Sequence, residues 1–369
     1  MRLRGLRCGS LKSSSKKTNN GKRLSTQGAN RVDNFFYPRY NRDMKESVKS
    51  IVLRALTDAC GSCVSGGELA SGAAVSRNAV WKAVKSLRVE GYDISARPNA
   101  GYVLKESPDI LSPEGISAYL GDCPVNYNII VKKETASTNT DAKRLAAEGA
   151  PEGTVIAAER QTAGRGRLGK SFYSPEKSGV YLSVIMRPEV SYSEAEYLTV
   201  IAALAVCDAI ESVFGAKTGI KWVNDIFIGG KKCAGILTEA ANDLESGRLE
   251  YAVIGIGVNL AVPKDGFPEE IRDIACGVCG SEIHGGRSLF TAELLKRFAD
   301  YYAAFDIKSN VEKYREKSVI IGCPITVIKP DGGREATAEG IDDRCRLIVR
   351  YPDGEREALS SGEVRICRQ

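Results

Sequence analysis

The chain has 369 residues, 43% of them hydrophobic and 27% charged, which is the composition of a folded globular protein and excludes a wholly disordered one. The length predicts roughly two or three domains. The longest strictly apolar run, Val200 to Cys207, is much shorter than the about 20 residues that a membrane helix needs. The formal net charge of +6 is uneven, because residues 1–43 hold eleven Lys and Arg against two Asp, which leaves the remainder slightly acidic. We therefore do not expect a basic, nucleic-acid-binding body.

Residues 1–43 show no apolar period, and we expect a disordered basic tail there. Such a tail could touch DNA, but its composition favours a start placed too early or a vector remnant, with Met44 as a natural first residue. An odd number of cysteines (eleven) without a secretory signal predicts a reducing, cytoplasmic location.

Residues 44–110 are predicted to form a winged helix-turn-helix domain. Helices are expected at 48–56, 66–70 and 77–90, the last capped by Ser76 and stopped by Gly91, followed by a hairpin over 92–104. The third helix would enter the major groove of DNA. Its candidate DNA-binding side chains are Arg77, Asn78, Lys82 and Lys85, with Arg88 on the same exposed side. The alternative is a winged domain used only for protein contacts.

Residues 111–317 mix strand-like runs at 154–158, 180–186, 234–238 and 251–259 with long helices at 194–214 and 288–305. No strict strand–helix–strand repeat is present, so the fold class is predicted to be α+β with a mixed sheet. Residues 318–369 contain three short β runs, at 324–328, 346–349 and 364–366, separated by Pro-Asp-Gly turns. They predict a small β-barrel domain.

The segment Gly164–Gly169 matches G-x-G-x-x-G, but residues 170–175 cannot begin the helix that a dinucleotide site requires. Two of the variable positions are Arg165 and Arg167. Glycines let backbone amides approach an anion and arginines neutralise it, so an anion-binding loop is predicted, with a solvated surface loop as the alternative.

Three further segments carry polar groups. Ser137, Thr138 and Asn139 precede a helix expected from about Thr140; a Thr138–Asp141 capping box is one interpretation and a ligand-binding helix start is the other. A hairpin that turns at residues 229–230 should bring Asn224 and Asp225 near Lys232. The last strand, which ends at Asn259, contains glycines among its apolar residues. Glycine in a strand often marks a place where a ligand approaches the backbone closely.

Metal and nucleophile chemistry are not indicated. The pairs Cys60/Cys63 and Cys276/Cys279 lie too far apart in the sequence for a zinc ribbon, so we expect loop thiols and no metal site. The one histidine, His284, lies in an expected loop, which disfavours a Ser-His-Asp or Cys-His mechanism.

Taken together, Ser-Thr-Asn, Gln161-Thr-Ala-Gly-Arg-Gly-Arg, Lys221-Trp-x-Asn-Asp, Lys232-x-Ala-Gly-Ile-Leu and Gly255-x-Gly-x-Asn closely resemble the motifs of the biotin protein ligase family, in family order. With the winged module, residues 45–369 resemble the bifunctional type, in which the ligase is also a repressor. Two departures are Val223, where the family usually has Pro, and Leu168-Gly169-Lys170, where a further Arg is common.

The resemblance implies a fold and an activity. The fold would be a winged domain at 44–110, a biotin/lipoate-ligase-like catalytic domain at 111–317 and an SH3-like β-barrel at 318–369. The activity would join biotin to ATP, with Mg²⁺, to give biotinyl-5′-AMP and pyrophosphate, and then pass biotin to a lysine of a biotin carboxyl carrier protein. Operator DNA and a ligand-linked homodimer would be the further partners. Positioning and electrostatics suffice for this chemistry, and no side-chain nucleophile is needed.

The resemblance also implies roles for residues. The ureido ring of biotin would be bound by Ser137, Thr138, Asn139 and Gln161, over the space left by Gly255 and Gly257. The carboxylate and α-phosphate would be covered by Arg165, Gly166 and Arg167, and Lys232 would bridge their oxygens. Asn224 and Asn259 would face the adenylate. Asp225 would orient or deprotonate the incoming lysine.

Three alternatives remain open on the sequence. They are a lipoate ligase of related fold, a ligand-sensing repressor without catalysis, and a ligase whose winged module binds no DNA.

Overall fold

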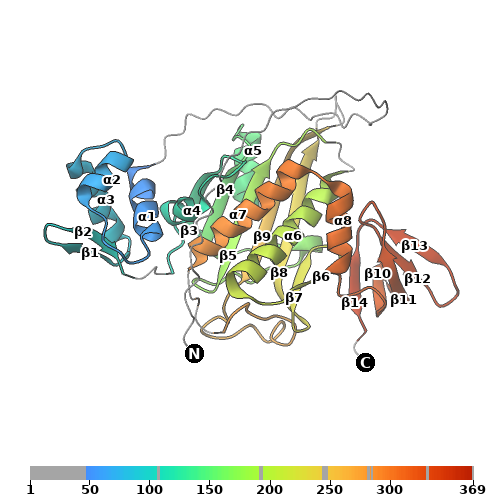
Figure 1. The fold of residues 1–369 in the computed structure, drawn as a ribbon. Helices are drawn as coiled ribbons and strands as arrows, with labels where there is room; N and C mark the ends of the chain where they lie inside the picture. Colours follow the sequence, from blue (N-terminus) through green and yellow to red (C-terminus); the bar gives the residue numbers. More distant parts are fainter. Residues whose placement is uncertain are drawn as a thin grey trace, which may run out of the picture. The chain divides into compact units, whose positions relative to one another are not determined.

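The computed structural model describes residues 47–105, 109–190, 194–242, 248–280, 283, 286–329 and 332–367. The expected tail at 1–43 and the loop position of His284 lie outside these residues. Helices and strands fall into three groups along the chain, at 48–104, 113–316 and 324–366 (Figure 1).

The first group is the winged helix-turn-helix arrangement that the sequence predicts. Its elements are α1 (Val48–Asp58), α2 (Gly66–Gly72), α3 (Arg77–Val89) and the antiparallel hairpin β1 (Ile94–Arg97) and β2 (Gly101–Leu104). Ser76 caps α3 through a hydrogen bond from the Ala79 amide, and Gly91 follows the helix with a φ of +105°, a conformation that favours glycine. The apolar sides of the helices enclose a core that includes the fully buried Val52, Leu56 and Leu87.

The central group is built on a mixed sheet, as predicted, and this sheet has seven strands among the described residues. Its order is β3 (Asn128–Thr135), β4 (Thr154–Gln161), β5 (Gly179–Met186), β9 (Leu249–Asn259), β8 (Lys231–Asn242), β7 (Asp225–Ile228) and β6 (Gly219–Lys221). Only β3 and β4 run parallel, and every other neighbouring pair is antiparallel. Consecutive side chains of a strand point to opposite faces, so the helices on each face determine which residues remain open.

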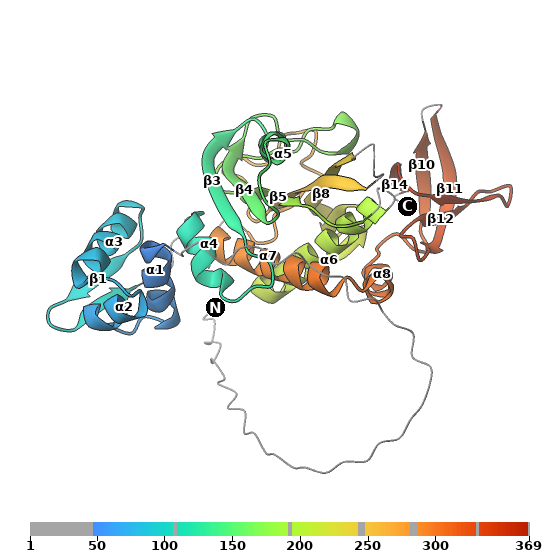
Figure 2. The ribbon, with the colours of Figure 1, turned by 90° about the horizontal axis from the view of Figure 1, so that it is seen from above.

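The two faces of this sheet are covered unequally. The long helices α6 (Ala195–Phe214) and α7 (Arg287–Ala304) lie on one face, whereas α5 (Thr138–Ala147) lies on the other (Figure 2). The first face supplies most of the main core, including Leu182, Ile254 and Ile256. The α5 face has only a small cluster around Ala142, and the sheet beyond that cluster is where the polar motifs gather. Two shorter helices complete the group, α4 (Pro113–Leu120) and α8 (Ile307–Glu316).

Helix α6 has the length and composition of a helix that could cross a membrane. Its packing argues for a different role, because residues from Leu198 to Cys207 are almost completely buried within the protein core. A helix that is apolar on all sides is expected at the centre of a large domain.

The last group is a five-stranded antiparallel sheet. Its order is β13 (Arg356–Leu359), β12 (Leu347–Arg350), β11 (Gly332–Ile341), β10 (Pro324–Lys329) and β14 (Glu363–Ile366). The apolar runs predict β10, β12 and β14, but not β11 and β13, which are rich in charged residues. These two strands are joined to their neighbours through Glu339, whose carboxylate pairs with Arg350 at 2.7 Å and Arg356 at 2.8 Å across the sheet.

Candidate functional site

Three glycines on β8 and β9 form a flat surface on the α5 side of the sheet, which we name the glycine floor: Gly235, Gly255 and Gly257. Gly235 pairs directly with Gly257 across the two strands. A Cβ atom at Gly255 would lie 2.0 Å from Asn139 Oδ1, and one at Gly257 would lie 2.6 Å from the Phe172 ring. Functional side chains therefore rest against the backbone of these strands, which explains why glycine is needed there.

Asn139 lies above Gly255 and is held from three directions. Its Nδ2 donates to the Leu237 carbonyl at 3.2 Å and to Glu239 Oε2 at 2.9 Å, while its Oδ1 accepts from Ser183 Oγ at 2.5 Å. Both amide hydrogens are thus committed within the protein, and one lone pair of Oδ1 is left for a ligand. Sequence reasoning missed Ser183 and Glu239, because strand pairing alone brings them to Asn139.

Glu239 is itself fixed by Lys143, whose Nζ lies 2.5 Å from Glu239 Oε1. Burial acts to raise the pKa of Glu239, but the hydrogen bonds from Lys143 and Asn139 outweigh burial and hold this pKa below its ordinary value. Glu239 is therefore an anion that orients Asn139 at neutral pH.

The start of α5 does not form the capping box that is one interpretation of the sequence. The helix begins at Thr138, and the Ser137 side chain makes no capping hydrogen bond. The amide and hydroxyl of Thr138 both donate to Gln161 Oε1, at 2.9 and 3.2 Å, and Asp141 binds Lys132 and Thr135 instead. The helix start is thereby joined to the end of β4.

The glycine loop, residues 164–170, leaves the end of β4 and bends back on itself. The Phe172 amide donates to the Gly164 carbonyl at 2.9 Å, and the Gly166 amide donates to the Lys170 carbonyl at 2.7 Å. A single 3₁₀ turn (Arg167–Gly169) is followed by extended chain, and no helix begins in the described residues 170–178, which excludes the dinucleotide interpretation. Arg165 is exposed at the surface of this loop.

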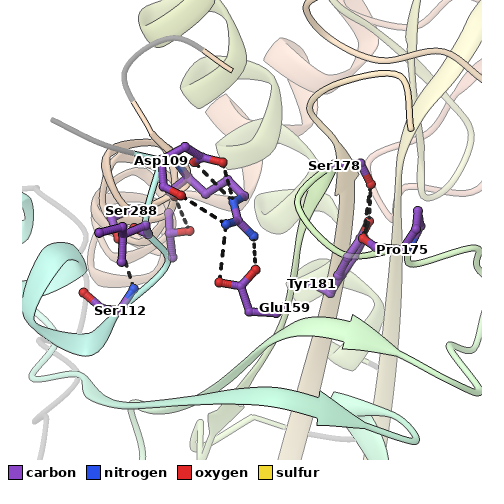
Figure 3. Close-up of polar contacts among 10 residues, drawn as sticks. Asp109, Ser112, Glu159, Pro175, Ser178, Tyr181 and Ser288 are labelled. Atoms are coloured by element: carbon purple, nitrogen blue, oxygen red, sulfur yellow. Dashed lines mark hydrogen bonds and ion pairs between the residues drawn. The ribbon is translucent and has the colours of Figure 1, made fainter. Parts of the chain in front are cut away.

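The chain after the loop is anchored to β5. Tyr181 donates from its hydroxyl to the Pro175 carbonyl at 3.0 Å (Figure 3). Its ring contacts the Phe172 ring edge-on at a centroid distance of 6.3 Å. This anchoring places the Phe172 ring over Gly257 as an aromatic wall of the site. Phe172 is another residue that sequence reasoning did not assign.

Lys232 lies beside Asp225, as the hairpin over residues 225–235 predicts. Lys232 Nζ is 2.6 Å from Asp225 Oδ1 and 3.1 Å from the position that a Cβ of Gly235 would take, so the ammonium group rests on the floor. Asn224 accepts from Arg167 Nη1 at 3.3 Å and donates to the Ile236 carbonyl at 2.7 Å. The peptide bond between Trp222 and Val223, the position where the family usually has Pro, is cis. Lys232 thus lies at one end of the floor, and Arg167, from a separate segment, contacts Asn224, the neighbour of Asp225.

The segment after β9 folds back beside Lys232. The Lys232 amide donates to the Ile274 carbonyl at 2.8 Å, and the Cys276 amide donates to the Lys232 carbonyl at 2.9 Å. Asn259 is buried at the end of β9, and its carbonyl accepts from the Val278 amide at 2.9 Å. This return segment forms a further wall of the site that the sequence did not predict.

A cavity of about 430 Å³ adjoins the glycine loop at the outer edge of β8. Its lining includes Arg167 from the loop, Glu196 from α6, and Arg344 and Arg346 from the chain before β12. Burial raises the pKa of Glu196, and the charge of Arg167 opposes this rise. The charged side chains of the cavity are therefore mainly cationic, and they lie among apolar residues such as Val223 and Ile236.

Within the described residues, no cluster of three or more His, Cys, Asp or Glu side chains is placed to hold a metal ion. Cys60, Cys63, Cys276 and Cys279 are free thiols. The Cys279 thiol donates to the Leu260 carbonyl at 2.9 Å.

The predicted DNA-binding side chains lie on one face of α3. Arg77, Asn78, Lys82 and Lys85 are exposed, and Trp81 between them is 50% exposed with Lys85 Nζ 5.4 Å from its ring centroid. Arg88, expected on the same side, donates from Nε to the Ile94 carbonyl at 2.6 Å and so supports the hairpin.

Comparisons with known proteins agree with this geometry. Residues 131–259 match the model of the biotin/lipoate A/B protein ligase family, residues 320–366 match that of the biotin protein ligase C terminal domain, and residues 51–103 match an HTH domain. These segments contain the glycine floor, the last sheet and the winged elements.

Relatives and solved structures point the same way. The bifunctional ligase/repressor BirA of Bacillus spizizenii is 34% identical over 83% of this chain and 95% of its own length. The protein of the same name from Bacillus subtilis is 35% identical over the same shares. The structure of the biotin protein ligase from Aquifex aeolicus in complex with biotin and ATP has a TM-score of 0.54 and 25% identity, covering 65% of this chain and 99% of that one. On this agreement of site, domains and full-length relatives, the chain belongs to the biotin protein ligase family, in its bifunctional ligase/repressor type.

Proposed function

We propose that biotin lies on the glycine floor and that Arg165, Arg167 and Lys232 hold its carboxylate against the α-phosphate of ATP. One observation carries this proposal: the Lys232 ammonium group rests on the floor itself, and Arg167 reaches the same end of the floor through Asn224. A strand surface without side chains of its own, beside cationic side chains, suits a flat, uncharged ring system with an anionic tail.

The reaction needs the approach of two anions. A carboxylate oxygen of biotin attacks the α-phosphorus, a new P–O bond forms, and the bond to the β-phosphate breaks as pyrophosphate leaves. Cationic groups reduce the repulsion between the reactants and stabilise the charge that builds up on the phosphate. Binding energy therefore acts through position and charge, and the reaction needs no side-chain nucleophile.

Mg²⁺ fits this site as a companion of ATP. No group of three or more acidic, histidine or cysteine ligands is described in the chain, and Mg²⁺ is commonly held by nucleotide phosphates with one or two carboxylates. Asp225 is the carboxylate that lies nearest to Lys232 and could take that part. When bound, the ion would neutralise phosphate charge and orient the leaving pyrophosphate.

The ring of biotin would be recognised at the start of α5. The Ser137 hydroxyl makes no capping bond, Thr138 and Gln161 form one connected pair, and Asn139 retains a lone pair of Oδ1. We assign these four residues to the ureido group, Gly255 and Gly257 to the floor beneath the ring system, and Gly166 to the loop that covers the tail. Asn224 and Asn259, at the other end of the floor, are assigned to the adenylate.

In the second step a lysine of a biotin carboxyl carrier protein attacks the acyl carbon, and AMP leaves. The attacking amine must lose a proton first. Asp225 can accept or orient that amine once the phosphates draw Lys232 away from it. Ordering of the glycine loop over the adenylate would keep water from hydrolysing it.

The winged domain supports a repressor function in the cytoplasm. Two winged domains, brought together by a ligand-linked homodimer, would each place α3 in the major groove of a palindromic operator. The exposed Arg77, Asn78, Lys82 and Lys85 are the side chains that would contact it.

Biotin-dependent ATP–pyrophosphate exchange tests the catalytic part. We expect exchange with biotin and ATP, and none with ATP alone. A protein that binds biotin but gives no exchange would be a ligand-sensing repressor without catalysis.

A thermal-shift comparison separates biotin from lipoate. We expect biotin to raise the melting temperature and lipoate to leave it unchanged, because the polar start of α5 suits a ureido ring and lipoate has none. Stabilisation by lipoate alone would overturn the substrate assignment.

A further inference from the structure

A buried arginine joins the segment that follows the winged domain to the strand that carries Gln161. Arg287, the first residue of α7, has a side chain only 1% exposed. Its Nε lies 3.0 Å from Asp109 Oδ2, and its two terminal nitrogens donate to both carboxylate oxygens of Glu159. One cation is thus shared by two carboxylates that approach from different elements (Figure 3).

Asp109 belongs to the chain that leaves the winged domain. Besides its ion pair, its Oδ1 accepts from the Arg287 backbone amide at 2.8 Å, so it caps a helix whose own N-cap residue, Gly286, has no side chain to do so. Ser288 donates from Oγ to the Ile110 carbonyl at 2.6 Å. The first turn of α7 therefore fixes the position of residues 109 and 110.

Glu159 belongs to the ligand side. It lies on β4 two residues before Gln161, whose side chain accepts from the Thr138 amide and donates to Ser174. Gln161 and Glu159 both lie at the end of β4. A bound ring system that displaced Gln161 would therefore also act on Glu159. Because Glu159 is bound through two oxygens to a buried guanidinium group, that displacement reaches Arg287.

A second contact chain leads onward into the winged domain. The Ser112 amide donates to Ser288 Oγ at 3.3 Å, and the Ser112 hydroxyl lies 2.8 Å from the Tyr92 hydroxyl. Gly115 leaves the space for this meeting, since a Cβ there would lie 2.7 Å from both Ser288 Oγ and the Tyr92 hydroxyl. Tyr92 follows α3 and is buried in the winged core. Side-chain contacts joined by short backbone steps thus lead from Gln161 to Tyr92, whose amide donates to the Leu87 carbonyl of α3 at 3.0 Å.

We propose that Arg287 is a positioning residue that couples occupancy of the biotin pocket to the segment carrying the winged domain, through Glu159 on one side and Asp109 on the other. This inference rests on the proposed function of the pocket. A buried charge with partners on both sides cannot lose one of them cheaply, so movement of either carboxylate must be followed by the guanidinium group. A chain of contacts does not by itself show coupling. The two regions are coupled only if ligand binding shifts these side chains, and such a shift can be measured.

Hydrogen exchange of backbone amides in the full chain, with and without biotin plus ATP, tests the coupling. In the wild type we expect the ligands to slow exchange in two places, the glycine-loop region 161–174 and the linker with α4, residues 109–120. A coupling of ordinary strength corresponds to at least about fivefold at the distant segment. In Asp109→Asn and in Glu159→Gln, we expect the slowing at 161–174 to persist and the ligand-dependent part at 109–120 to disappear.

The matched control is Glu293→Gln, which removes an ion pair with Arg297 on the surface of the same helix, α7. This variant should keep the ligand-induced slowing of exchange at both 161–174 and 109–120. Gly115→Ala is a second test that leaves all charges in place. The added methyl group would push against Tyr92 and should also abolish the ligand-dependent slowing at 109–120. Any variant that fails to fold is recognised by fast exchange throughout, and the remaining variants then decide.

The outcomes separate the inference from the proposed function. Ligand-induced slowing at 161–174 but not at 109–120 in the wild type overturns the coupling alone. An unchanged response at 109–120 in Asp109→Asn and Glu159→Gln does the same. No slowing at 161–174 with biotin and ATP contradicts the pocket assignment, and the coupling fails with it.

Discussion

At the scale of single residues, we propose that Lys232 contributes most to the chemistry. Its ammonium group lies on the glycine floor and is held by Asp225, so it is placed before any ligand arrives. We predict that Lys232→Ala lowers the rate of biotin-dependent ATP–pyrophosphate exchange by about 100- to 1000-fold, the effect of losing one group that stabilises transition-state charge. Lys231→Ala, which removes the exposed neighbouring ammonium group, is the control and should exchange almost normally. An exchange rate close to wild type in Lys232→Ala would refute this role.

Glu239 gives the site a dependence on pH. Its pKa is lowered in the folded protein, so its contribution to stability is complete above the ordinary value of 4.5 and is lost as the pH falls below that value. Protonation would weaken its hold on Asn139. We therefore predict that biotin affinity, measured by titration calorimetry, falls on acidification below about pH 4.5. In Glu239→Gln this part of the pH dependence should vanish; its persistence in that variant would assign it to another group.

At the scale of elements, β9 is shaped by its glycines. The Asn139 amide above Gly255 is held by three hydrogen bonds and cannot give way cheaply. Gly255→Ala should therefore lower the free energy of unfolding by about 1–3 kcal/mol, the usual cost of overpacking, and abolish biotin binding. Gly340→Ala is the matched control, because a Cβ in that strand meets no atom within 4 Å. Equal melting temperatures and equal biotin affinities for the two variants would contradict the proposal that biotin binds on the glycine floor.

Trp81 on α3 allows DNA binding to be tested by tryptophan fluorescence. The chain has two tryptophans, and Trp222 is buried with its Nε1 donating to the Cys345 carbonyl, whereas Trp81 is half-exposed on the face predicted to contact DNA. We predict that mixed-sequence duplex DNA at low salt changes the fluorescence of the wild type but not of Trp81→Phe. The effect should weaken steeply with added salt, as phosphate contacts require. An unchanged signal would favour a winged domain used for protein contacts.

At the scale of the whole molecule, the sequence predicts the motifs of the candidate site better than the helices and strands that hold them in place. The groups at 137–139, 161–167, 224–232 and 255–259 each contain glycine or polar residues where a regular helix or strand would not select them, so the motifs are visible along the chain. The order of β4, β5, β9 and β8 then brings them together. By contrast, β3, α4 and α8 were not predicted, since short or partly charged elements depend on tertiary packing for their stability.

The missed side chains have a common cause. Ser183, Glu239 and Phe172 act through neighbours that are distant in sequence, and Arg287 is an ordinary arginine until folding buries it between two carboxylates. No local period or spacing reports such pairings. Conversely, the expected pairing of Thr138 with Asp141 is a valid local pattern that tertiary contacts with Gln161 and Lys132 displaced.

We propose above all that Arg165, Arg167 and Lys232 act together beside the glycine floor to join biotin and ATP. A crystal structure of the full chain grown with both substrates tests it most directly. We predict the ring system of biotin above Gly255 and Gly257, with Arg165, Arg167 and Lys232 in hydrogen-bond contact with the new carboxyl–phosphate linkage. The account would be contradicted if the product occupied another part of the molecule, or if it lay on the floor while those three side chains pointed into solvent.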